Sequence, residues 1–149
     1  MKIKQPAGFW VRLGARALDG IILGVVFSLL TYLIYGEFFR DYTPLDTLNM
    51  LYFVLIPVIW YGYTIGKKAT GVRILRKNGA KVGVGRMILR EFVGSLVYAL
   101  TLGIGIIVSA FMVGLRDDKR AIHDFIAGTY VTHQSPEKNS KQVMEGKHA

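Results

Sequence analysis

Three long stretches without Asp, Glu, Lys or Arg dominate this sequence of 149 residues, namely residues 20–36, 47–66 and 92–115. Each is close to the ~20 apolar residues with which an α-helix crosses the hydrocarbon core of a bilayer. With 52% hydrophobic and only 19% charged residues, a soluble domain would expose too much apolar surface. The sequence therefore predicts an all-α membrane protein with two transmembrane helices, in the first two stretches, and a third hydrophobic segment.

The third segment permits two topologies. It is long enough for one span, but Gly103-Ile104-Gly105 divides it into halves that are too short to cross separately. A single span would place residues 116–149 outside the cell, whereas a re-entrant hairpin would return them to the cytoplasm. The charges of residues 116–124 cancel, three basic against three acidic, and do not decide between the two.

The charges of the connecting segments predict the orientation. Residues 1–17 carry four basic groups and no acid, residues 37–46 carry one base and three acids, and residues 67–90 carry eight bases and no acid. Because basic segments stay on the cytoplasmic side, we expect a multi-pass protein of a bacterial inner membrane with a cytoplasmic N-terminus. No small-residue cleavage site follows the first apolar stretch, which we interpret as an uncleaved anchor.

The basic residues of the second loop are predicted to contact the anionic headgroups of the lipid bilayer. Beside a membrane span, lipid is a simpler partner for such charge than nucleic acid, and no nucleic-acid partner is expected. These residues are Lys67, Lys68, Arg73, Arg76, Lys77, Lys81, Arg86 and Arg90.

The same loop contains a turn signal. Asn78-Gly79 separates Val72 and Ile74 from Val82 and Val84, a pattern typical of a two-residue β-hairpin. We expect a small cytoplasmic β-hairpin here, to which residues 129–133 would add a third strand, since two strands alone are marginally stable. The predicted membrane domain covers residues 1–133, and residues 134–149 form a polar tail predicted to be disordered.

Several charged residues lie at the ends of the apolar stretches. Arg12, Arg16 and Asp19 fall on one helix face, which predicts either a structural ion pair or an ion or proton site. His123 and Asp124 are adjacent, so on a helix they diverge by about 100° and make a weak pair of metal ligands. With three His and no Cys in the chain, neither a metal nor a cofactor is expected.

Small residues recur at four-residue spacing, in Gly20-xxx-Gly24 and in Gly105-xxx-Ser109. This spacing lets helix backbones approach closely, either within one chain or in an oligomer. The chain contains no phosphate-binding loop, zinc-protease motif or nucleophile elbow. We therefore predict that it is not an enzyme.

Three segments together resemble the RDD family of membrane proteins, named for one Arg and two Asp. Residues 9–20 resemble its opening Arg-x-x-Ala-x-x-x-Asp motif, which places the family's Arg on Arg12 and its first Asp on Asp19. Residues 64–74 resemble its middle Gly-Lys-x-x-x-Gly segment, and residues 123–131 resemble its closing His-Asp-x-x-Ala-Gly-Thr segment. The second Asp then falls on Asp124.

The resemblance implies transport of unidentified ligands, with cation and proton exchange in some members. One hypothesis is a cytoplasm-facing cation or proton site built on Arg12, Asp19 and Asp124, completed by oligomerisation because three segments enclose no pathway. The alternative is a non-catalytic regulatory or inhibitory subunit bound to a larger membrane enzyme or transporter. If both Asp residues act together they share one membrane face, which favours the re-entrant hairpin with its tip at Gly103-Ile104-Gly105.

Overall fold

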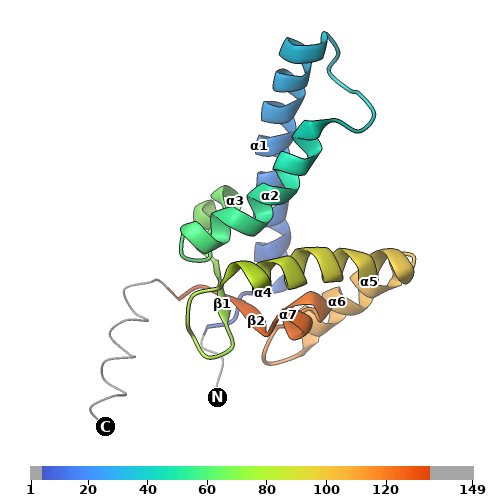
Figure 1. Ribbon diagram of the computed structural model, residues 1–149. Coiled ribbons are helices and arrows are strands. Elements are labelled where there is room, and N and C mark those ends of the chain that lie inside the picture. Colours follow the sequence, from blue (N-terminus) through green and yellow to red (C-terminus); the bar gives the residue numbers. More distant parts are fainter. Residues whose placement is uncertain (1–4, 135–149) are drawn as a thin grey trace.

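The computed structural model describes residues 5–134, so most of the predicted polar tail lies outside the described residues. The longest element is α1 (Phe9–Tyr35), whose 27 residues extend about 40 Å at a rise of about 1.5 Å each. It ends at Gly36, which takes up a left-handed conformation with φ +77°. Figure 1 shows α1 rising from the base of the molecule, with the next helix returning beside it.

The second helix, α2 (Pro44–Ile59), begins at residues that are typical of a helix start. Thr43 is its N-cap, and the Asp46 carboxylate accepts a hydrogen bond from the Thr43 N–H at 2.6 Å. It ends earlier than predicted, because Tyr61 and Gly62 have positive φ, and the Gly62 N–H donates to the Pro57 carbonyl at 2.6 Å. The 16 residues extend only about 24 Å. A short helix, α3 (Ile65–Ala69), follows.

The third apolar stretch forms two helices joined by a sharp reversal. A helical rod begins in α4 (Val84–Ile88), passes through a π-helical turn, η1 (Leu89–Val93), and ends in α5 (Gly94–Leu100). Leu102 and Gly103 both have positive φ and reverse the chain into α6 (Ile104–Leu115). A single continuous helix across this stretch is therefore not formed. Among the described residues, only α1 is both long and apolar enough to cross a bilayer.

A two-stranded antiparallel sheet lies at the base of α1. Strand β1 (Arg73–Arg76) pairs with β2 (Thr129–Thr132), which follows α7 (Ile122–Ala127). The prediction that residues 72–74 pair with residues 82–84 was wrong, because Val84 begins α4. Strand β1 pairs instead with the segment that was expected to add a third strand. Asn78-Gly79 still makes a tight turn, and the Arg76 N–H donates to the Ala80 carbonyl at 3.0 Å.

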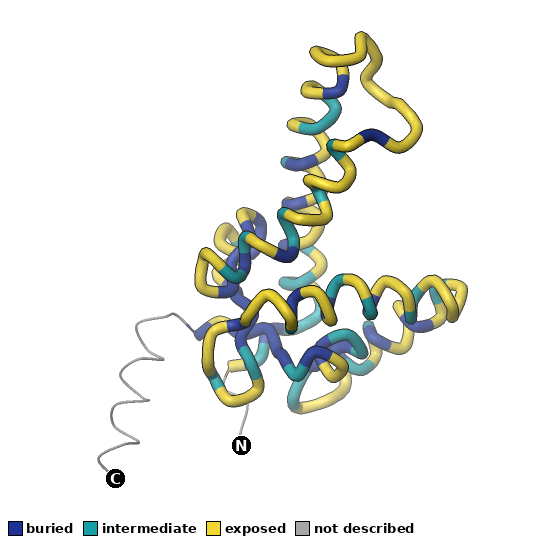
Figure 2. Tube along the Cα trace, viewed as in Figure 1, coloured by how far each residue is buried: buried dark blue, intermediate teal, exposed yellow. Residues whose placement is uncertain are grey.

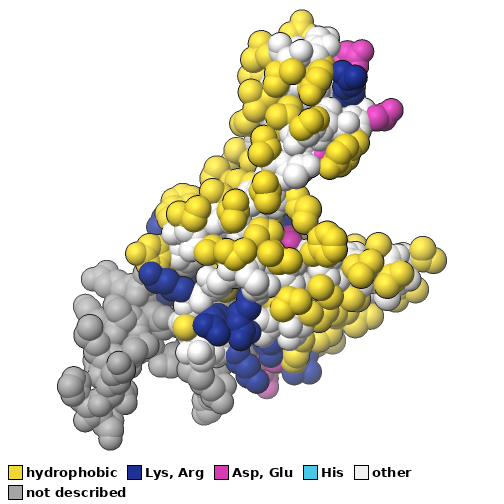
Figure 3. Space-filling model, in the orientation of Figure 1, with side chains coloured by type: hydrophobic (Ala, Val, Ile, Leu, Met, Phe, Trp, Pro, Cys, Tyr) yellow, Lys and Arg dark blue, Asp and Glu magenta, His cyan; other side chains and the backbone are white. Residues whose placement is uncertain are grey.

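Burial is concentrated around this sheet. The core combines residues of α1, α2 and α4 with residues of β1 and β2, including Ala15, Val54, Ile74, Met87 and Val131. Figure 2 shows the upper part of α1 and the α5–α6 hairpin as mostly exposed. Figure 3 shows that hydrophobic side chains cover these exposed parts, while Lys and Arg side chains gather near the base. This division suits a molecule whose upper part lies in lipid.

The predicted small-residue faces behave differently from each other. Gly105 and Ser109 are buried where α6 meets α5, and a Cβ at Gly105 would lie 3.0 Å from Tyr98 Cδ1. Gly20 and Gly24 are exposed, and a Cβ at either would meet nothing within 4 Å. The first pair therefore packs within the chain, whereas the second leaves a shallow strip on α1 open.

Candidate functional site

Asp124 joins three distant parts of the sequence. Its side chain is fully buried at the start of α7, and its Oδ2 accepts from Arg12 Nη1 at 2.6 Å. Its Oδ1 pairs with Arg90 Nη1, from the π-helical turn. Burial alone would raise the pKa of Asp124, but the charges of Arg90 and Arg12 hold it well below its usual range. The carboxylate is therefore ionised at neutral pH.

Further contacts fix this ion-pair cluster in place. Asp124 Oδ2 also accepts from the Ala121 N–H at 3.1 Å, and Arg120 donates to the backbone carbonyls of Asp124 and Thr129, both at 3.0 Å. Arg12 Nε donates to the Ala7 carbonyl at 3.0 Å. These charge-assisted bonds tie α1, α7 and β2 together.

Asp19 lies in a separate cluster. It is fully buried on α1 and accepts from the Thr64 hydroxyl at 2.5 Å, the Gly66 N–H at 2.7 Å and the Tyr52 hydroxyl at 3.1 Å. The ion pair predicted for Asp19 with Arg12 or Arg16 is not formed, because within residues 5–134 Arg12 pairs with Asp124 and Arg16 with Glu91. Neutral hydrogen-bond donors from α2 and α3 solvate it instead.

Glycine makes the Asp19 cluster possible. A Cβ at Gly66 would lie 2.1 Å from the Ala15 carbonyl oxygen and 2.9 Å from Asp19 Cγ. Only a residue without a side chain lets the start of α3 touch α1 this closely. The first glycine of the Gly-Lys-x-x-x-Gly segment, Gly66, is therefore required for the close packing of α3 on α1.

The next residue, Lys67, is a buried cation with few partners. It is 8% exposed, and its Nζ reaches Thr64 Oγ1 at 3.4 Å. Within residues 5–134, no carboxylate oxygen lies within 4 Å of this ammonium. Burial lowers the pKa of Lys67 to about 8. The charges of Arg90 and Arg16 act in the same direction, while Asp19 and Glu91 oppose the shift.

Arg90 and Glu91 project from the π-helical turn toward α1. Glu91 Oε2 lies 3.4 Å from Arg16 Nη1, and Glu91 Oε1 lies 3.8 Å from Arg90 Nε. Arg16 also stacks on Phe53, 4.0 Å from the ring centre. A π-turn inside an α-helix shifts the side chains by one position, and such turns are frequent at functional sites.

His123, on α7, belongs to a hydrogen-bonded chain of side chains that joins α7 to α5 and α6. Its Nδ1 lies 2.6 Å from the Tyr98 hydroxyl, which lies 2.8 Å from the Ser109 hydroxyl. Burial and the charge of Arg90 lower the pKa of His123 to about 3, so the imidazole is neutral. Asp124 is within 3.9 Å of His123 Nε2 but binds the arginines.

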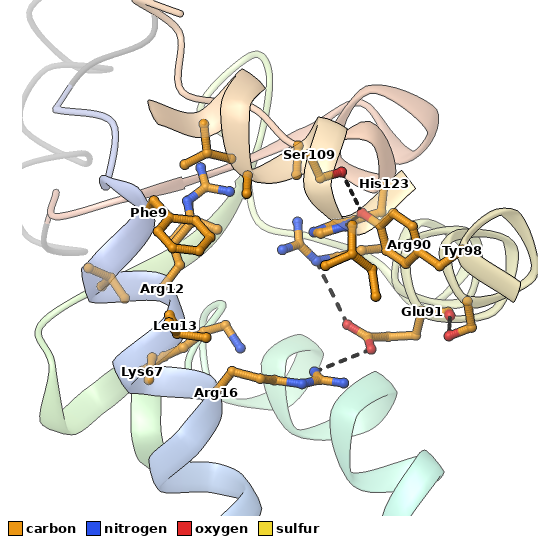
Figure 4. Close-up of a pocket in the computed structure, with 18 residues that line it drawn as sticks. Phe9, Arg12, Leu13, Arg16, Lys67, Arg90, Glu91, Tyr98, Ser109 and His123 are labelled. Carbon is orange, nitrogen blue, oxygen red and sulfur yellow. Dashed lines mark hydrogen bonds and ion pairs between the residues drawn. The ribbon is translucent and has the colours of Figure 1, made fainter. Parts of the chain in front are cut away.

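These side chains surround a cavity of about 390 Å³ between α1, η1, α6 and α7. Figure 4 shows Arg12, Arg16 and Lys67 on one side, Arg90, Glu91 and Tyr98 opposite, and Ser109 and His123 together at one end. Four cations and one carboxylate line the cavity, a surplus of 4 − 1 = 3 positive charges. With buried Asp19 and Asp124 included, the region still carries 4 − 3 = 1 positive charge.

The structure places the eight basic residues of the second loop in different environments. Lys67, Arg73 and Arg90 are buried, so their side chains are not displayed on the outer surface, and contact of this loop with anionic headgroups stays a prediction. Arg73 Nε donates to the Gln134 carbonyl at 2.6 Å, and burial lowers the pKa of Arg73. Arg76 and Arg86 are half-buried, and the exposed members are Lys68, Lys77 and Lys81.

Comparison with known proteins identifies the class. The chain belongs to the RDD family, whose model matches residues 6–128. It is 46% identical over 136 residues to the uncharacterized protein YckC of Bacillus subtilis (strain 168), covering 91% of this chain and 90% of that protein. It is 30% identical to the uncharacterized membrane protein YteJ of the same strain, over 86% of this chain and 81% of YteJ.

A third relative from that strain, the uncharacterized protein YxaI, is 29% identical over 89% of this chain and 100% of its own length. No solved structure matches the chain. The family match, the relative described as a membrane protein and the long apolar helix together give this chain the character of a membrane protein.

Of the five predicted site residues, the structure brings Arg12, His123 and Asp124 together, places Arg16 at the cavity edge and separates Asp19. The sequence interpretation missed the roles of Lys67 and Arg90, which it assigned to a surface loop. One signal was available: the Gly-Lys motif singles out Lys67 among eight bases. No pattern in the sequence indicates that Arg90 pairs with Asp124.

Proposed function

We propose that this chain is a non-enzymatic, transport-related membrane protein that binds an anionic ligand in the cavity at the base of α1. The observation that carries the proposal is Lys67, a buried ammonium that lines the cavity and has no carboxylate within 4 Å in the described part of the chain. A buried charge without a counter-ion is costly, and an anionic ligand would relieve that cost.

A cation is a less suitable ligand for this cavity. Asp124 already faces two arginines, and Asp19 already accepts three hydrogen bonds. A metal ion or proton would have to displace these partners. Glu91 is the remaining carboxylate of the lining, and it lies between Arg16 and Arg90. The cation or proton hypothesis drawn from the sequence is therefore replaced by an anion hypothesis.

The proposed arrangement in the membrane follows from charge and exposure. In this arrangement α1 and α2 lie in the bilayer, the loop at residues 37–43 is outside, and the base with the N-terminus and the sheet is cytoplasmic. The α5–α6 hairpin enters the bilayer from the cytoplasmic side and returns. Its tip residue Leu102 is 92% exposed and α6 is apolar on its outer face, which supports contact with lipid.

Single cysteines in this Cys-free chain test the arrangement. An impermeant maleimide applied to intact cells should label an Arg40→Cys variant and leave Lys77→Cys unlabelled until the membrane is opened. Leu102→Cys should stay unlabelled in both conditions, because its thiol lies in lipid. Labelling of Lys77→Cys from outside would overturn the proposed orientation, and ready labelling of Leu102→Cys would overturn the re-entrant hairpin.

Anion binding is tested on the purified chain in nanodiscs of phosphatidylcholine. Inorganic phosphate should raise the melting temperature relative to chloride at the same ionic strength. Lys67→Met should abolish most of this shift, while Lys77→Met, which alters an exposed lysine, should keep it. Equal phosphate shifts in the two variants would contradict the proposal.

The exposed strip at Gly20 and Gly24 favours a second candidate, in which the chain is a regulatory subunit or an oligomer. A helix face with glycines at this spacing and open space above each suits close packing against another membrane helix. Affinity purification in mild detergent tests it. Gly20→Leu should release a stoichiometric partner or second copy, whereas recovery of the monomer alone from the unchanged chain would exclude it.

A further inference from the structure

We infer that the anionic ligand is a membrane lipid, whose phosphate headgroup occupies the cavity while its acyl chains lie outside, along α1 and α6. This inference rests on the proposed function and names its ligand class. It is carried by the division of the cavity into a cationic end and an apolar side that reaches the surface of the molecule.

The cationic end has donors suited to a phosphate. Lys67 Nζ has one weak partner. Arg90 uses Nη1 and Nε for Asp124, Thr129 and Glu91, and its Nη2 makes no hydrogen bond or ion pair within residues 5–134. Arg16 is half exposed at the edge of the cavity. Arg guanidinium groups bind phosphate oxygens in pairs, and a lysine adds a compact charge.

The apolar side is formed by α1 and α6. Leu13 and Ile106 line the cavity and remain 48% and 57% exposed, so they belong both to the cavity and to the outer surface. Beyond them, Ile107 and Phe111 continue the exposed apolar surface along α6. A hydrocarbon chain leaving the cavity past Leu13 and Ile106 therefore meets apolar surface, whereas a soluble anion would gain nothing from this side.

The size of the cavity agrees with this division. A volume of about 390 Å³ lies at the lower end of the ~300–1,000 Å³ of small-molecule sites. It accommodates a phosphate headgroup with its glycerol, but not two acyl chains, which must lie outside on α1 and α6. A lipid entering from the bilayer reaches the cavity through this apolar opening.

The test compares a phosphate headgroup that carries acyl chains with the same headgroup without them. The full-length protein in phosphatidylcholine nanodiscs is titrated with glycerol phosphate or supplied with phosphatidic acid as a minor component. Melting temperature and native mass spectrometry report binding. Phosphatidic acid should bind at least about tenfold more tightly than glycerol phosphate, and Lys67→Met should weaken both by about tenfold or more.

A rim variant separates the lipid from a soluble anion. The double variant Leu13→Ala with Ile106→Ala should reduce phosphatidic acid retention several-fold and leave glycerol phosphate binding unchanged. Leu96→Ala is the matched control, since Leu96 is similarly exposed but lies on α5 and does not line the cavity. Its retention of lipid should equal that of the unchanged chain.

Two outcomes would overturn the inference in distinguishable ways. If glycerol phosphate binds as tightly as phosphatidic acid, or the rim variant retains lipid fully, the lipid assignment is wrong and anion binding stands. If binding of neither probe depends on Lys67, the proposed function fails as well.

Discussion

Replacing Asp124 by Asn removes one charge from the ion-pair cluster while keeping nearly the same shape. In the protein the carboxylate accepts from Arg12 at 2.6 Å and pairs with Arg90, and all three side chains are largely or fully buried. An Asn amide has one acceptor oxygen, so its NH₂ group would face a guanidinium. Both arginines would then be left with uncompensated charge in a dry environment.

Two independent estimates of the cost agree. Removing one partner of a buried ion pair costs about 3–5 kcal/mol. Counting the two lost charge-assisted hydrogen bonds at roughly 1.5–3 kcal/mol each gives about 3–6 kcal/mol. We therefore expect Asp124→Asn to reduce the free energy of unfolding by about 4 kcal/mol at neutral pH.

The assay is unfolding by SDS in mixed micelles, followed by circular dichroism, with Asp118→Asn as the control. Asp118 pairs with Arg116 at 3.0 Å, but the arginine side chain is 52% exposed, and such exposed pairs contribute about 0–1 kcal/mol. The folded pKa of Asp124 is depressed, so its contribution is present above the unfolded pKa of ~3.9 and is lost as pH falls. Equal losses from the two substitutions at pH 7 would refute this reasoning.

Two further predictions use the same unfolding measurement. Relative to Lys67→Met, the unchanged chain should gain roughly 3 kcal/mol in free energy of unfolding as the pH rises from about 8 to 10.5. The reason is that the folded pKa of Lys67 is lowered, so folding releases a proton in that window. A difference between the two chains that does not change with pH would contradict the burial of a charged Lys67. Gly66→Ala should destabilise the fold by at least ~1–3 kcal/mol, since its Cβ would lie 2.1 Å from the Ala15 carbonyl oxygen. In the control Gly85→Ala the new Cβ meets no atom within 4 Å, so this substitution should be neutral or stabilising. Similar effects of the two substitutions would count against the close contact of α3 with α1.

The sequence predicted local features well where one physical signal dominates. The start of α2 follows from Thr43, Pro44 and Asp46, and the reversal of the third stretch coincides with Gly103. A capping residue or a flexible glycine acts over a few neighbours, so its effect can be read from adjacent positions. The long apolar helix is equally evident, because lipid exposure leaves a continuous run of hydrophobic residues.

Long-range pairing was less predictable. The Asn78-Gly79 turn indicated a hairpin, but β1 pairs with a strand more than fifty residues later, because Ile74 and Leu75 are buried against β2. The ion-pair partners were also exchanged: Arg12 binds Asp124 rather than Asp19, a neighbour on its own helix face. Helical spacing says which side chains can meet along one helix, and it carries no information on what another helix brings to them.

The contacts of β2 and Asp124 with earlier segments of the chain have a consequence for biosynthesis. The Ala7 N–H donates to the Val131 carbonyl, and the charges of Arg12 and Arg90 are neutralised by Asp124, which is synthesised after both of them. Until Asp124 and β2 are synthesised, the base of α1 therefore lacks these partners. A nascent chain stopped before Asp124 therefore carries two unneutralised arginines and an unpaired strand, so it lacks the contacts that join the base of the completed fold.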